Sequence, residues 1–198
     1  MKTLISTMKR LGGLALGLVL STALGMSSGE AGSPDNVSQL FGSRVQANDR
    51  FAVPFATADF DGDGTADAVY LVTILPHSAE HKLAADVTVI SKLFGLAPLG
   101  PRGESLALAI LQDGGKRKFL LTGYQSEGVS GYFESPIWRG MPVPLAVAKR
   151  GSKSFAEFQQ QEKKIRHDIL VVGTEAGIDT ALYWNGKSYA IFRPIEEP

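Results

Sequence analysis

Four aspartates are crowded into one short stretch of the sequence, ADFDGDGTADAVYLV, which then runs into apolar residues. Alternate side chains of a tightly curled loop turn toward a common centre, and Gly64 permits the left-handed bend that such a loop needs. The carbonyl of Thr65 can point to the same centre. Without a cation, carboxylates this close together would repel one another. The stretch therefore predicts a cage of hard oxygen ligands for calcium, formed by Asp59, Asp61, Asp63, Thr65 and Asp67.

The order of residues after the loop separates two kinds of calcium site. A helix-loop-helix calcium hand needs a glutamate at the twelfth loop position, where this chain has Tyr70 inside a strand-like run. The pattern Asp-x-Asp-x-Asp-Gly-x-x-Asp followed by an apolar strand instead resembles the calcium loops of FG-GAP and VCBS repeats, the integrin-propeller type. The resemblance covers about fifteen residues and a single copy of the loop.

That resemblance implies one structural calcium ion and a secreted or surface-exposed protein. By the same resemblance, the side-chain ligands are Asp59, Asp61, Asp63 and Asp67, and Thr65 is a backbone ligand. A cage filled by side chains leaves little room for a substrate, so we expect a structural role for the ion.

A second metal motif is the string HSAEH, from His77 to His81. It matches the His-x-x-Glu-His string of inverted zinc proteases, in which two histidines bind zinc and Glu80 would activate water. That chemistry needs both histidines on one turn of a helix and a distant third ligand such as Glu134 or Glu157. A proline precedes the string and little room is left before the next strand, so a solvated connection is favoured. A small zinc-dependent hydrolase remains the alternative function.

Other catalytic chemistries have little support in the sequence. The chain has no cysteine and no Gly-x-Ser-x-Gly elbow, so neither route to a covalent intermediate is indicated. His167 stands alone beside a predicted strand and is expected at the surface. The formal net charge is zero, with 20 basic and 20 acidic residues, which does not favour binding to nucleic acid. We therefore expect a binding module rather than an enzyme.

An aromatic segment, GYQSEGVSGYFESPIWRGMPVP, offers a candidate partner surface. Tyr132, Phe133 and Trp138 are residue types that binding surfaces favour, so a protein or glycan partner could be bound there. The alternative is that the segment covers one apolar face of a sheet.

The N-terminus has the order of a secretory signal peptide over residues 1–31. Three basic residues precede an apolar run from Leu11 to Gly25, which is shorter than the ~20 residues of a spanning helix. Cleavage after Ala23, Gly25 or Ala31 remains open. A periplasmic or secreted protein, free of the membrane after cleavage, is the resulting prediction.

The rest of the chain, residues 32–198, predicts one mainly β or α+β domain with antiparallel strands and one or two short helices. Short apolar or alternating runs are separated by Gly, Pro, Asp and Ser. The predicted strands have the sequences DAVYLVTIL, DVTVI, SLALAIL, KFLLTGY, LAVAK, HDILVVG, DTALYW and KSYAIF.

Two hairpin turns are predicted between these strands. Asp113-Gly114-Gly115 separates two apolar runs, and Asn185-Gly186 suits a type I′ turn. Trp184 and Tyr189 flank the second turn and are expected to pair across strands. The last thirty or so residues therefore predict a three-stranded meander.

One helix is predicted over residues 155–166. Ser154 and Glu157 have capping-box spacing, and Phe158 and Ile165 fall on one helical face.

Overall fold

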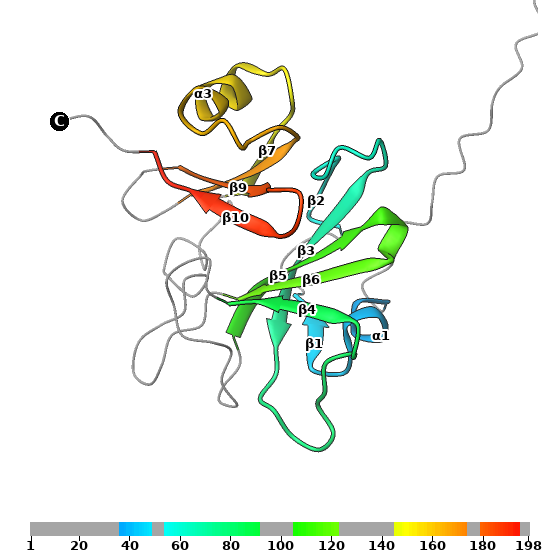
Figure 1. Cartoon of the computed structure of the whole chain (residues 1–198). Helices are drawn as coiled ribbons and strands as arrows, with labels where there is room; N and C mark the ends of the chain where they lie inside the picture. Colours follow the sequence, from blue (N-terminus) through cyan, green and yellow to red (C-terminus); the bar gives the residue numbers. More distant parts are fainter. Residues whose placement is uncertain (1–35, 49–53, 92–104, 123–144, 174–178, 195–198) are drawn as a thin grey trace, which may run out of the picture.

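The computed structural model describes residues 36–48, 54–91, 105–122, 145–173 and 179–194. Over these residues the chain forms two β-sheets packed together as one compact, mainly β domain with short helices (Figure 1). The predicted fold class is therefore confirmed.

The first sheet has six strands, in the order β1-β3-β5-β6-β4, with β2 also paired to β3. Its pairs are antiparallel except β4 with β6, which is parallel. The pair of β4 with β6 is the exception to the predicted antiparallel pairing, and the chain through β5 provides the long crossover connection that a parallel pair requires. The strands are β1 (Val45–Ala47), β2 (Ala56–Ala58), β3 (Asp67–Ile74), β4 (Val87–Ile90), β5 (Ser105–Gln112) and β6 (Arg117–Thr122).

The second sheet is an antiparallel meander of four strands in the order β10-β9-β8-β7. The predicted three-stranded meander is confirmed, and the LAVAK strand extends it by one. The strands are β7 (Leu145–Ala148), β8 (Ile169–Val172), β9 (Thr180–Trp184) and β10 (Tyr189–Phe192).

Both sheets are buried on both faces. Along β3, Val69 and Leu71 face the second sheet, while Tyr70 and Val72 face helix α1 (Val37–Phe41). In the second sheet, alternate residues likewise face either the first sheet or helix α3 (Lys153–Gln161). The order of layers is thus helix, sheet, sheet, helix, which explains why the strand sequences are continuous apolar runs.

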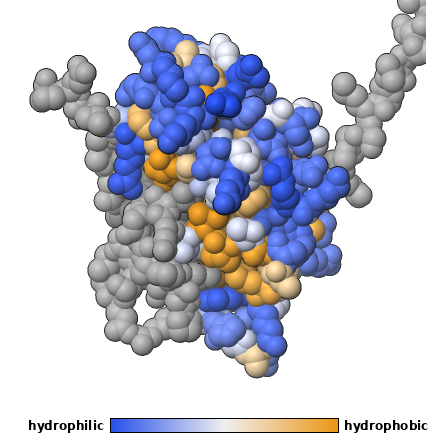
Figure 2. Space-filling model, viewed as in Figure 1, coloured by the Kyte–Doolittle hydropathy of each residue, from blue (hydrophilic) through white to orange (hydrophobic). Residues whose placement is uncertain are grey.

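Strand β4 is the edge of the first sheet and is less covered than its neighbours. Its Val89 is 38% exposed, more than any other large hydrophobic side chain in the described ranges. Figure 2 shows an apolar patch in this region of the surface, beside largely hydrophilic residues.

Both predicted hairpins form, but the second uses a different turn. The residues that link β5 to β6 are Asp113, Gly114 and Gly115, and all three have positive φ angles. In the other turn only Gly186 has a positive φ, and the side-chain oxygen of Asn185 accepts hydrogen bonds from the amides of Lys187 and Ser188, 3.0 Å each. The type I′ prediction is wrong, because Asn185 uses its side chain to close the turn.

Helix α3 begins earlier than predicted and is shorter. Ser152, not Ser154, is the N-cap, since its hydroxyl accepts a 3.2 Å hydrogen bond from the amide of Phe155. The helix ends at Gln161. Ile165 is buried, but it belongs to the connection that follows the helix. The apolar spacing was therefore a sound guide to burial but not to the helix end.

Mutation of each serine distinguishes Ser152 from Ser154 as the N-cap of α3. Ser152→Ala is expected to lower the free energy of unfolding by about 1 kcal/mol, because an orphan helix amide loses its acceptor. Ser154→Ala, the matched control inside the exposed first turn, should be neutral or slightly stabilising. Denaturant unfolding of both variants measures the difference, and a larger loss in Ser154→Ala would contradict the observed cap.

Candidate metal centre

The aspartate loop joins β2 to β3 and is closed by its own side chains. Asp59 accepts hydrogen bonds from the amides of Gly62, at 2.7 Å, and Gly64, at 3.1 Å. Asp61 accepts from the amide of Asp63 at 3.2 Å. Both glycines have positive φ, +79° and +85°, which lets the backbone curl around the carboxylates.

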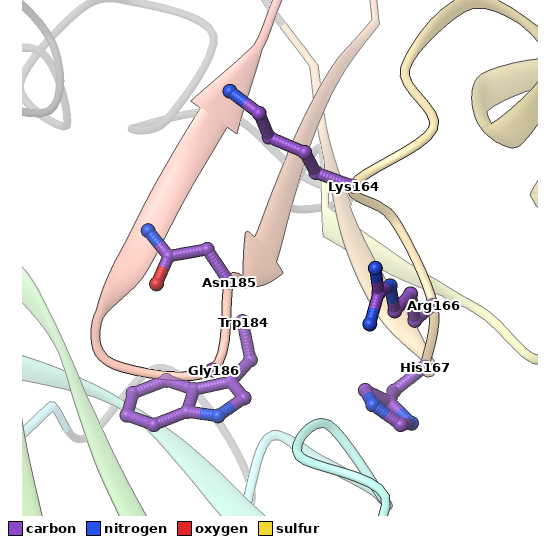
Figure 3. Close-up of a pocket in the computed structure, with 6 residues that line it drawn as sticks. All are labelled: Lys164, Arg166, His167, Trp184, Asn185 and Gly186. Atoms are coloured by element: carbon purple, nitrogen blue, oxygen red, sulfur yellow. The ribbon is translucent and has the colours of Figure 1, made fainter.

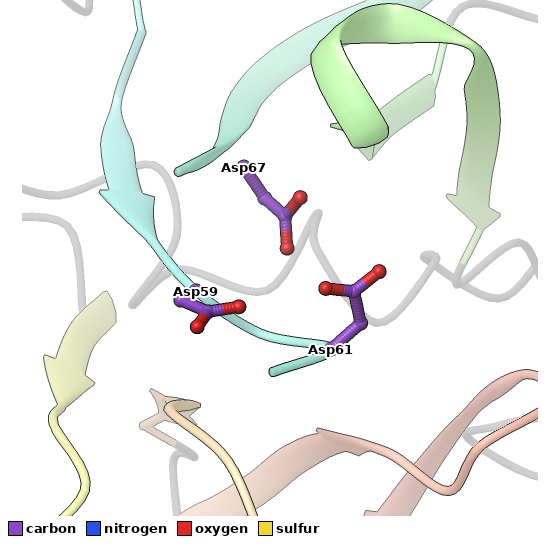
Figure 4. Close-up of side chains that lie close together, drawn as sticks. All are labelled: Asp59, Asp61 and Asp67. Atoms are coloured by element: carbon purple, nitrogen blue, oxygen red, sulfur yellow. The ribbon is translucent and has the colours of Figure 1, made fainter. Parts of the chain in front are cut away.

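Three of the predicted ligands come together. One carboxylate oxygen from each of Asp59, Asp61 and Asp67 lies within 4.8 Å of the others, and Figure 4 shows the three carboxylates turned toward a shared space. Asp59 and Asp67 meet because the last residue of β2, Ala58, pairs with the first residue of β3.

Asp63, a further predicted ligand, lies outside this group of three. Asp63 is exposed, and its carboxylate accepts a 2.7 Å hydrogen bond from the amide of Thr65, which is also exposed.

Asp67 is the most unusual member of the group. Its side chain is 1% exposed; Oδ2 accepts a 3.0 Å hydrogen bond from the amide of Phe60, but Oδ1 is buried without a hydrogen-bond partner. Burial raises the pKa of Asp67 to about 7, aided by the charges of Asp61 and Asp63; the hydrogen bond from the amide of Phe60 opposes the rise, as does the nearby amide of Asp113, which does not satisfy Oδ1. The protein thus holds a carboxyl group whose charge is poorly compensated.

Arg117, at the start of β6, is a partner that the sequence did not reveal. Its guanidinium forms an ion pair with Asp61, whose side chain is only 3% exposed. The same guanidinium lies 5.1 Å from the centre of the Trp184 ring, a cation–π arrangement. No local pattern marks Arg117, because 56 residues separate it from Asp61.

Beneath Arg117 lies a cluster of three aromatic rings. The rings of Phe119, Trp184 and Tyr189 meet edge to face at 5.4–5.5 Å, which confirms the predicted pairing of Trp184 with Tyr189. The Tyr189 hydroxyl accepts a 2.7 Å hydrogen bond from Gln112. Burial, together with the charges of Asp67 and Asp61, raises the pKa of Tyr189 well above its usual value.

The loop also contacts the second sheet, through the residues just before β8. Asp168 accepts hydrogen bonds from the amide of Asp59, at 3.3 Å, and from the amide of Arg150, at 2.7 Å. His167 packs against Gly62 so closely that a Cβ atom there would lie 2.0 Å from its Nδ1. His167 is half-buried, so it is partly at the surface, as predicted, but it does not stand alone, because it packs against the loop.

These contacts define what the site can bind. The three clustered carboxylates offer hard oxygen donors of the kind calcium prefers, and the orphan Oδ1 of Asp67 lacks the partner that a buried carboxylate oxygen requires. Arg117 compensates one of the three charges and leaves two, which a divalent cation would match.

The zinc-protease string does not form a helix. Residues 77–81 lie in the connection between β3 and β4, and the hydroxyl of Ser78 accepts hydrogen bonds from the amides of Glu80 and His81. His77 and Glu80 are exposed. Over the described part of the chain, Asp59, Asp61 and Asp67 are the one group of metal-ligand type. The suggested third ligand Glu157 is on α3, and Glu134 lies outside the described residues.

Two further predictions fall on residues that the structure does not describe, namely the signal peptide at 1–31 and the aromatic surface of Tyr132, Phe133 and Trp138. Among the helices that are described, none has the length and apolar character to cross a membrane.

Comparison with known proteins adds no relative. The chain matches no protein-family model, and no curated protein or solved structure is significantly similar to it.

Proposed function

We propose that this protein is an exported calcium-binding module of mainly β structure, in which the ion has a structural role. Asp59, Asp61 and Asp67 are the ligands that the geometry favours. Asp63 and the carbonyl of Thr65 are further ligands suggested by the resemblance to FG-GAP and VCBS loops. Export is proposed from the signal-like residues 1–31, and a protein or glycan partner at Tyr132, Phe133 and Trp138 from residue type alone.

The observation that carries the proposal is the orphan oxygen of Asp67. A buried carboxylate oxygen without a hydrogen bond costs free energy unless a cation or a proton compensates it. The Asp67 carboxylate lies beside a space that it shares with two other carboxylates, and the loop gives all three the spacing of a small cage (Figure 4).

The position of the cage supports a structural role. The loop extends β3 of the first sheet, yet it contacts Asp168 and His167 beside the second sheet. A cation bound there neutralises the loop at the joint between the two sheets. We therefore expect calcium to strengthen the contact between the sheets rather than to activate a substrate.

Metal analysis tests the proposal. Purified protein dialysed against calcium should hold about one calcium and negligible zinc, because its clustered donors are all oxygens. Asp61→Asn should lose most of the calcium, while His77→Ala should keep it. Atomic emission measures both metals in all three proteins.

The same measurement addresses the alternative function. One equivalent of zinc in the wild type, lost in His77→Ala, would overturn the calcium proposal in favour of a zinc-dependent hydrolase using His77, Glu80 and His81. If the wild type holds neither calcium nor zinc, and titration with calcium gives no heat in calorimetry, both the calcium proposal and the zinc-hydrolase alternative are overturned.

A further inference from the structure

A pocket of about 180 Å³ lies beside the metal centre but does not include it. It opens between the connection that leads into β8 and the turn between β9 and β10. Its lining residues are Lys164, Arg166, His167, Trp184, Asn185 and Gly186. In Figure 3 Arg166 and His167 stand on one side of the opening, while Trp184 and Asn185 stand on the other.

The lining is unusually rich in hydrogen-bond donors. Lys164 and Arg166 are positively charged, and their side chains contain donor groups but no acceptor atom. The side-chain oxygen of Asn185 is occupied by two backbone amides of its turn, which leaves the NH₂ group of that side chain as the free part. The indole of Trp184 can only donate. A ligand that accepts several hydrogen bonds at once fits this set.

No carboxylate lines the pocket to compensate its charges. Asp168 is close to the pocket residues in sequence, but its carboxylate accepts hydrogen bonds from the backbone amides of Asp59 and Arg150. Glu162 accepts a 2.9 Å hydrogen bond from the backbone amide of Lys164, not from its ammonium group. In the described part of the chain, neither Lys164 nor Arg166 forms an ion pair.

The volume limits what can enter. A space of about 180 Å³ is smaller than the ~300–1,000 Å³ of drug-sized ligand sites, so it suits a single small group rather than a whole cofactor. Charge and donors together select an anionic group with several oxygens.

We propose that this pocket binds the oxyanion group of an acidic ligand, either a sulfate or phosphate ester or the carboxylate of an acidic sugar. Arg166 and Lys164 pair with the anion, and Asn185 and Trp184 complete its hydrogen bonds. The proposal does not depend on calcium binding, because it uses none of the aspartates of the loop.

Titration followed by NMR tests the proposal. Sodium sulfate, sodium phosphate and sodium glucuronate are each added to the full chain in a chelator, against sodium chloride at equal ionic strength. The amide signals of Asn185 and Gly186 and the indole signal of Trp184 should shift saturably, with about millimolar affinity for the best anion. Saturation by the inorganic anions alone identifies an ester ligand, and saturation by glucuronate alone identifies an acidic sugar.

Two exposed lysines that are neighbours in sequence supply the control. Arg166→Gln and Lys164→Gln are expected to weaken binding by roughly tenfold each, because each removes a charge-assisted contact. Lys163→Gln removes the same charge one residue away, outside the pocket, and should leave the affinity unchanged. Shifts that do not saturate, or an equal loss in Lys163→Gln, would overturn the proposal, since the effect would then be general screening.

Discussion

Asp67→Asn is expected to stabilise the calcium-free protein while abolishing its response to calcium. In the wild type without metal, the ionised Asp67 is buried with one oxygen unpaired. Asparagine keeps the shape and can still accept the hydrogen bond from Phe60. It removes the charge whose burial raises the pKa of Asp67 to about 7. At pH 8 the free energy of unfolding of the variant should therefore exceed that of the wild type by up to about 4 kcal/mol.

With calcium, the stability advantage of Asp67→Asn over the wild type should shrink. At a calcium concentration about one hundred times Kd, the wild type gains roughly 2.7 kcal/mol, or about 5–10 °C in melting temperature for a domain of this size. Asp67→Asn should gain almost nothing. Thermal melts of both proteins in calcium and in chelator measure all four values.

The pH profile of the calcium-free protein is the internal check. The pKa of Asp67 is raised on folding, so the folded state holds its proton between about pH 3.8 and pH 7 while the unfolded state has lost it. The contribution of Asp67 to stability therefore falls as the pH rises through this window, and the advantage of Asp67→Asn should grow with it. If the variant is instead less stable at pH 8 in chelator, the cost assigned to this carboxylate is wrong.

Gly62→Ala should be clearly more damaging than Gly64→Ala. Both glycines have positive φ, so both alanines bring backbone strain of about 1–2 kcal/mol. At Gly64 the added Cβ meets nothing within 4 Å, whereas at Gly62 it would lie 2.0 Å from the imidazole of His167. The ring must move, and we expect Gly62→Ala to lose a further ~1–3 kcal/mol. Denaturant unfolding measures the difference.

A double-mutant cycle assigns that extra cost to the contact. His167→Ala opens the space, so Gly62→Ala on that background should cost about as much as Gly64→Ala on the wild type. Equal losses for the two glycine variants on the wild type would show that the loop is not held against the second sheet. That result would also remove the structural reason for placing calcium at the joint between the sheets.

Much of the fold could be predicted because it is written in local patterns. The apolar runs of β3, β5, β8 and β9, the Asp113-Gly114-Gly115 turn, and the pairing of Trp184 with Tyr189 follow from residue type and spacing. The errors arose where several local solutions compete. Ser152 and Ser154 are both acceptable caps, and Asn185 can enter a turn through its backbone or through its side chain.

The candidate site was predictable in part for the same reason. Asp59, Asp61 and Asp67 are brought together by a short hairpin, whose closure depends on a few neighbouring residues and on two glycines. Asp63, chosen by the same spacing, instead turns to the amide of Thr65. Alternation in sequence predicts which side chains can meet but not which backbone amide captures each one.

Residue types and their spacing define the chemistry available to this protein: a run of hard oxygen donors in a glycine-rich turn, ahead of a strand that must be buried. How those donors are used is a property of the folded protein. It buries Asp67 without a partner for one oxygen, pairs Asp61 with Arg117, and seats the loop against His167. The contacts of the loop with Arg117 and with Asp168 join residues 56 and 109 positions apart, and they arise from the order and packing of the strands, which no local pattern encodes.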